Sequence, residues 1–90
     1  MNFEWNEEKR EQNVNKHRVD FLYAALIFEG ESLTREDDRE NYGEIRFASL
    51  GLVDGVAYTV IHTERGGNIR LISEWKGGQK DYEKYKKSFP

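Results

Sequence analysis

The fold is decided by the stretch Glu44–Glu74, which reads EIRFASLGLVDGVAYTVIHTERGGNIRLISE. Three runs in it have the composition of β-strands, namely Glu44–Leu52, Val56–Glu64 and Ile69–Glu74. The pair Asp54-Gly55 is typical of a two-residue hairpin turn, and Gly66-Gly67 is a second hairpin signal. The stretch therefore predicts an antiparallel meander of three strands.

Helices are expected on both sides of this meander. Asn2–Trp5 alternates like a short strand, and Asn6 followed by two glutamates is a favourable start for a polar helix that ends at His17. After Asp20 an apolar helical segment covers 21–28, and its residues at helical spacing form the expected buried stripe: Phe21, Ala24, Ala25 and Phe28. A closing helix is predicted over Gln79–Phe89.

The segment Glu29–Glu44 carries seven carboxylates against two arginines, so we expect a surface strand or loop there. The element order then predicts one α+β domain over residues 1–90. It has an N-terminal strand, two helices, an antiparallel sheet of three to four strands and a C-terminal helix.

Composition excludes several classes of site. The chain has no cysteine, which rules out disulfides, thiolate catalysis and Cys-based zinc sites. Its two histidines are well separated, so we expect no metal and no cofactor. No apolar run approaches the ~20 residues of a membrane span and no signal peptide opens the chain, so we expect a cytoplasmic protein without membrane contact.

The net charge of −3 at first argues against a nucleic-acid ligand. The charge is unevenly spread, however: residues 1–45 carry −6 and residues 46–90 carry +3. The predicted sheet and last helix are therefore basic, and the objection does not hold for them.

The two hairpin turns predict which side chains share a face of the sheet. They place Arg46, Thr63 and Arg70 in one row, with the arginines about 10 Å apart, a span suited to phosphate groups. The same pattern puts Glu74 on that face and Ser73 and Trp75 on the opposite one. Alternatively, the arginines are surface residues that pair with Glu74 or with the acidic segment. A register slip of one residue would dissolve the row.

Other polar residues each allow two interpretations. His17 is a candidate general acid or base, or it only complements the helix dipole. Trp75 stacks on a nucleobase or packs at a strand end, and lysines such as Lys76 and Lys80 contact phosphates or are simply solvated. His62 is interpreted as a core or interface histidine.

Several stretches together resemble the BrnT family of toxins. They are Phe3-Glu4-Trp5-Asn6 with a charged helix ending Lys16-His17, Tyr42-Gly43-Glu44 before Arg46–Gly51, Val60–Gly66, Ile69–Ser73 and the C-terminal Lys/Tyr helix. The resemblance covers essentially the whole chain in order. It implies a RelE-like fold and the toxin of a bacterial type II toxin–antitoxin pair.

The resemblance also implies an activity and partners. Such a toxin is a metal-independent endoribonuclease that cleaves RNA and inhibits translation. Its partner is a BrnA-like antitoxin of the ribbon-helix-helix class, expected in a heterotetramer that contacts operator DNA through the antitoxin and represses the operon.

Under this resemblance the candidate site residues fall into two groups. The catalytic candidates are Arg46, Arg70, His17 and Glu64, and the RNA-binding candidates are Lys16, Ser73, Trp75, Lys76 and Lys80. Two departures from the family pattern stand out: Arg18 replaces the glycine after His17, and Glu74-Trp75 replaces Ala-Arg. Glu74 and Trp75 favour an alternative, a catalytically degenerate module that acts as partner or co-repressor of a DNA-binding antitoxin. An unrelated α+β interaction domain is a third possibility.

Overall fold

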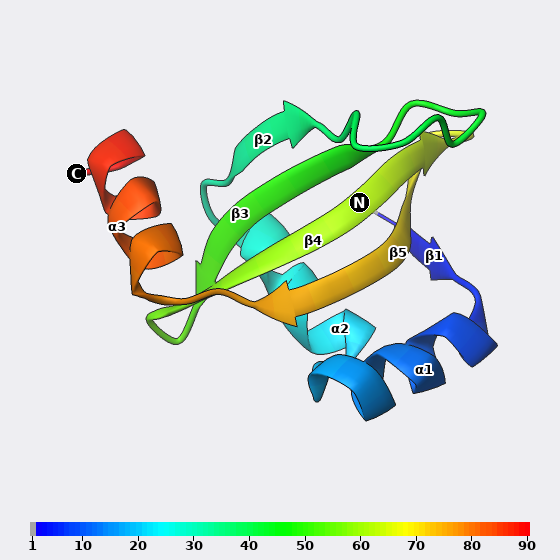
Figure 1. Cartoon of the computed structure of the whole chain (residues 1–90), viewed down its shortest axis with the longest axis horizontal. Helices are drawn as coiled ribbons and strands as arrows, with labels where there is room; N and C mark the ends of the chain where they lie inside the picture. The colour runs from blue at the N-terminus through cyan, green and yellow to red at the C-terminus, as the bar shows by residue number, and fades with distance from the viewer. Residues whose placement is uncertain (1) are drawn as a thin grey trace.

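The computed structural model describes residues 2–90 and is α+β, as predicted. Figure 1 shows its helices and strands. In chain order they are β1 (Phe3–Trp5), α1 (Glu7–His17), α2 (Phe21–Ala24), the 3₁₀ helix η1 (Ala25–Glu29), β2 (Leu33–Glu36), β3 (Phe47–Val53), β4 (Val56–Arg65), β5 (Asn68–Lys76) and α3 (Gln79–Ser88). None of the helices described is long and apolar enough to cross a membrane.

The sheet has five strands in the order β1-β5-β4-β3-β2, rather than the three or four predicted. The acidic segment contributes β2, which pairs antiparallel with β3. The N-terminal strand β1 pairs with β5 in parallel, so the sheet is mixed and not purely antiparallel. This pairing joins segments more than sixty residues apart, and nothing local in either segment encodes it.

Both hairpins form in the predicted register. Leu52 pairs with Ala57, and Thr63 pairs with Arg70. Asp54 and Gly55 have φ of 50° and 76°, while Gly66 and Gly67 have φ of 58° and 83°. Positive φ at both central residues is the geometry of a type I′ turn, whose twist matches that of the strands it joins.

A β-bulge changes the register halfway along β5. His62 pairs with Leu71, but Ile61 pairs with Ser73, which leaves Ile72 as the extra residue. Beyond it every side chain of β5 points to the face opposite the predicted one. The prediction for Ser73, Glu74 and Trp75 was therefore wrong.

The two faces of the sheet differ in what covers them. The core face carries Val60 and Leu71, and α2 and η1 cover it, lying behind the sheet in Figure 1. The other face, which we call the open face, carries Thr59, Ile61 and Thr63. Helix α3 packs against one end of it beside β3 and β4, and the segment before β3 covers Thr63, whose hydroxyl donates to the carbonyl of Ile45. After the bulge, Glu74 lies on the core face, whereas Ser73 and Trp75 lie on the open face.

The apolar segment after Asp20 is only partly α-helical. Phe21, Ala24 and Ala25 are buried as predicted, but Ile27 is buried and Phe28 is only half-buried. The chain tightens to a 3₁₀ helix from Ala25 onward, with about three residues per turn, and this turns Ile27 toward the sheet.

His62 is a core histidine, as predicted. Its ring packs against Phe28 and Phe47, and its Nε2 lies 2.7 Å from the hydroxyl of Ser49. Burial lowers the pKa of His62, because a charged imidazolium is harder to bury than the neutral ring.

Candidate functional site

One side chain, Asn13, docks α1 onto β5. It is the only buried residue of this polar helix. Its Nδ2 donates to the carbonyl oxygens of Val19 and Glu74 at 2.9 Å each, and its Oδ1 accepts from the backbone N–H of Glu74 at 3.0 Å. The Asn13 amide thus pairs with β5 as a neighbouring strand would, beyond the point where β1 ends.

This docking brings the end of α1 next to the bulged part of β5. His17 lies one helical turn after Asn13, on the same side of the helix. Its ring centroid is 6.0 Å from that of Trp75. The hydroxyl of Ser73 lies 3.4 Å from Asn13 Oδ1, so Ser73 is tied to the same helix.

Two adjoining hollows follow the line between α1 and β5. Both are lined by Lys16, His17 and Ser73, and the larger, open one has a cavity volume of about 540 Å³. We call the two together the α1–β5 groove; it is lined by Lys9, Gln12, Asn13, Lys16, His17, Arg39, Ile72, Ser73, Trp75 and Lys76. The lining includes four lysines or arginines and no carboxylate, so the groove suits an anionic ligand.

Five of the predicted site residues meet in this groove, although they come from two distant parts of the sequence. They are Lys16, His17, Ser73, Trp75 and Lys76. The bulge is what allows this, because without it Ser73 and Trp75 would point into the core.

Sequence reasoning missed Arg39, which reaches the groove from the acidic segment. Its guanidinium lies 5.7 Å from the centre of the Trp75 ring. Asp37 holds it through two hydrogen bonds, from Nε at 2.7 Å and from Nη2 at 3.0 Å. The Asp37 side chain is buried, and Arg39 lowers its pKa. An Asp-x-Arg pair in an acidic segment was the only signal, and it does not tell where the segment runs.

Arg46 and Arg70 lie outside the groove, and each has a carboxylate beside it. Arg46 donates to Glu44 at 3.0 Å and lies over the Tyr42 ring at 4.1 Å. Arg70 is 3.7 Å from Glu4. Arg46 thus pairs with the acidic segment, whereas the alternative pairing with Glu74 was wrong.

Glu64 and Lys80 also lie outside the groove. Glu64 is exposed near the end of β4 and pairs with Ile69 in the sheet. Lys80 is exposed in the first turn of α3. Neither lines either hollow.

Glu74 is fully buried beneath the groove. Neither carboxyl oxygen has a hydrogen-bond partner among the described residues, and burial raises the pKa to about 9. The carboxyl is therefore neutral at pH 7. The expected negative charge beside Trp75 is absent from the open face.

Arg18 ends α1 where the family pattern has glycine. It adopts the left-handed conformation, with φ of 59° and ψ of 30°, and its N–H donates to the carbonyl of Val14. The helix therefore ends at the same place without glycine, at the cost of a conformation that non-glycine residues disfavour.

A family model described as "Ribonuclease toxin, BrnT, of type II toxin-antitoxin system" matches residues 5–80. The chain belongs to the BrnT family. The match includes every residue that lines the α1–β5 groove. No curated protein matches the chain. Membership in this family of ribonuclease toxins implies an RNA target and a protein antitoxin as partner.

Proposed function

We propose that this BrnT-family chain is a metal-independent endoribonuclease whose active site is the α1–β5 groove. The observation that carries the proposal is the convergence of His17, Ser73 and Trp75 with four cationic side chains in a hollow without carboxylates. A proton carrier, a stacking surface and cations are the groups that RNA cleavage by an internal nucleophile needs.

In this reaction the 2′-oxygen of one nucleotide attacks the adjacent phosphorus, and the bond from phosphorus to the 5′-oxygen of the next nucleotide breaks. The products are a 2′,3′-cyclic phosphate and a 5′-hydroxyl. His17 takes the proton of the attacking hydroxyl, the departing 5′-oxygen takes a proton from water, and His17 then returns its proton to the hydroxide that is left. Lys16 and Lys76 stabilise the extra negative charge on the phosphoryl oxygens.

Trp75 offers a face on which a base stacks, and Arg39 supplies a further cation next to it. Arg70 lies on the same open face as Ser73, about 10 Å along β5. We assign Arg70 and Arg46 to phosphates of RNA beyond the groove, where RNA competes with Glu4 and Glu44 for them. Glu64 and Lys80 line neither hollow, so we give Glu64 no catalytic role and Lys80 no RNA contact in this proposal.

We further propose that the antitoxin is a DNA-binding ribbon-helix-helix protein, BrnA-like, and that the two assemble as a heterotetramer which represses the operon. Free toxin then cleaves cellular RNA and inhibits translation. The net charge of −6 on residues 1–45 supports docking of basic parts of the antitoxin. A salt titration tests this step, because the complex should weaken as ionic strength rises.

The alternative, a degenerate binding module, is favoured by one observation. Trp75 stands where the family pattern has an arginine, and its ring is flanked by Arg39 and His17. This alternative predicts a tight antitoxin complex without RNA cleavage.

The deciding experiment incubates the purified chain with an RNA oligonucleotide in excess EDTA. We expect wild type to cleave the RNA to a cyclic phosphate. His17→Ala should lower the cleavage rate ~10²-fold or more, whereas the exposed control Lys87→Ala should cleave at the wild-type rate. A single 2′-deoxy substitution at the cut position should block cleavage there. Intact RNA with folded wild-type protein would contradict the nuclease and favour the alternative.

A further inference from the structure

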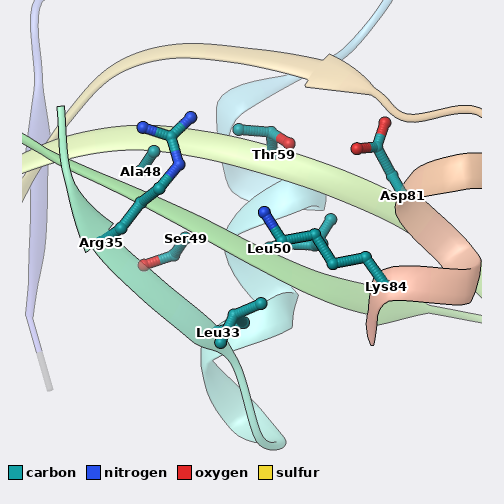
Figure 2. Close-up of a pocket in the computed structure, with 8 residues that line it drawn as sticks. All are labelled: Leu33, Arg35, Ala48, Ser49, Leu50, Thr59, Asp81 and Lys84. Carbon is teal, nitrogen blue, oxygen red and sulfur yellow. The ribbon is translucent and has the colours of Figure 1, made fainter. Parts of the chain in front are cut away.

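A further hollow lies on the open face, between β2, β3 and α3. Its cavity volume is about 60 Å³, or about 340 Å³ with the adjoining space that opens to solvent. Figure 2 shows the residues that line it. Leu33, Ala48 and Leu50 give it an apolar lining, and Thr59 adds a hydroxyl. We call it the α3–β2 pocket; none of its lining residues lines the α1–β5 groove.

Two cationic side chains enter this pocket from opposite sides. Figure 2 shows Arg35 reaching over it from β2 and Lys84 from α3. Neither forms a salt bridge with any residue in the range 2–90 that the structure describes. Asp81 is the one carboxylate in the lining, and it accepts a hydrogen bond from the backbone N–H of Gly78 at 3.2 Å. Asp81 thus serves the start of α3.

The pocket and the groove are ends of one row across the sheet. Leu33 pairs with Leu50, Leu50 with Thr59, and Thr59 with Trp75. Directly paired residues point to the same face, so all four side chains lie on the open face. Leu50 and Trp75 are two strand spacings apart, about 10 Å. Stacked nucleotides in a strand are about 3.4 Å apart, so roughly three of them span the distance from Trp75 to Leu50.

We propose that the α3–β2 pocket binds one nucleotide of the RNA strand whose scissile phosphate occupies the groove. The base lies against Leu33 and Leu50, and its phosphate contacts Arg35 and Lys84. An apolar hollow rimmed by two cations that form no salt bridge within residues 2–90 has the chemistry that a nucleotide requires. This inference rests on the proposed function, since it extends the path of the same RNA.

The test measures the Kd of two 2′-O-methyl RNAs, which cannot be cleaved. One has two nucleotides and fills the groove alone, and the other has eight and reaches the pocket. We expect Arg35→Ala and Lys84→Ala each to raise the Kd of the long RNA about tenfold and to leave the Kd of the short RNA unchanged. Each substitution should also lower the slope of log K against log salt concentration for the long RNA by about one. Lys87→Ala, on the same helix but outside the pocket, should change neither.

Each other outcome has a separate meaning. If wild type cleaves RNA but Arg35→Ala and Lys84→Ala leave the Kd of the long RNA unchanged, or weaken both RNAs equally, the pocket assignment is overturned and the nuclease stands. If the long RNA binds through Arg35 and Lys84 without cleavage of natural RNA, the nuclease is overturned and the pocket stands. If neither RNA binds, both are overturned.

Discussion

The two helical segments that flank the sheet are attached in opposite ways. The segment of α2 and η1 packs apolar side chains onto the core face, so closely that a Cβ on Gly51 would lie 2.6 Å from Cβ of Ile27. Helix α1 instead lies along β5 and buries a single polar residue, Asn13. One attachment is a packed interface, and the other is a set of hydrogen bonds.

This difference accounts for where a substrate can bind. Close packing against the core face leaves no room for a ligand there. Hydrogen bonding through Asn13 fixes α1 with little apolar contact, so that a polar and cationic groove stays open beside β5. Separate damage to the two attachments should therefore have separable consequences.

The largest effect is expected from breaking the packed interface. Ile27→Ala removes a fully buried side chain and should lower the free energy of unfolding by ~2–5 kcal/mol, as measured by urea denaturation. Leu26→Ala is the matched control, because the Leu26 side chain, next to Ile27, is substantially exposed. This substitution should cost no more than ~0.5 kcal/mol. Equal losses in the two variants would contradict the described packing of η1.

Breaking the hydrogen-bonded attachment should cost less stability but more activity. Asn13→Ala leaves the N–H and C=O of Glu74 unpaired, for ~1–3 kcal/mol, and frees His17 from its place beside Trp75. We expect a drop in the rate of RNA cleavage of roughly tenfold or more under conditions where the variant is fully folded. Asn15→Ala, exposed on the same helix, should change neither quantity. Loss of stability without loss of rate would show that catalysis does not depend on the position in which Asn13 holds α1.

A third variant tests the buried carboxyl between the two attachments. Glu74 keeps its proton in the folded state up to a pKa of about 9, whereas the unfolded chain loses it near pH 4.5. Between these values the unfolded state binds fewer protons, so stability falls as pH rises, by at most about 1.4 kcal/mol per pH unit.

Glu74→Gln removes this dependence, and its stability advantage over wild type should grow from pH 5 to pH 9. The comparison isolates Glu74, because His62 is common to both proteins. Denaturant melts across this range measure it. A constant difference between the two proteins would show that Glu74 is not buried as a neutral acid.

The smallest effect is expected at the end of α1. Arg18→Gly removes the cost of a left-handed residue and should raise stability by ~1 kcal/mol. Arg18→Ala is the control, since alanine pays a similar conformational cost and should not stabilise. A gain from both variants would point to the arginine charge and not to the backbone.

The parts of the fold set by local chemistry could be predicted from the sequence. Asp54-Gly55 and Gly66-Gly67 supply the positive φ that their turns require, which also fixes the register beside them. The bulge at Ile72 could not be predicted, because no residue there demands it. For the same reason Ser73 and Trp75 were placed on the wrong face.

The candidate site was predictable only as a set of residues. His17 and Trp75 were named from their chemistry, but their proximity depends on Asn13, whose hydrogen bonds leave no mark in hydrophobic periodicity. Arg39 could not be found because an irregular acidic segment carries it to Trp75. Side chains placed by a bulge, by a side-chain hydrogen bond or by an irregular loop escape pattern reasoning more readily than those placed by tight turns.

The central claim is that RNA occupies the α1–β5 groove, and one measurement addresses it directly. Uniformly ¹⁵N-labelled protein is titrated with an uncleavable 2′-O-methyl RNA while amide and indole resonances are followed by NMR. We expect the largest shifts at the indole of Trp75 and at the backbone of His17 and Ser73, with none at Leu22 and Leu26 on the exposed side of α2 and η1. Shifts centred on Leu22 and Leu26, or no shifts at saturating RNA, would contradict the claim.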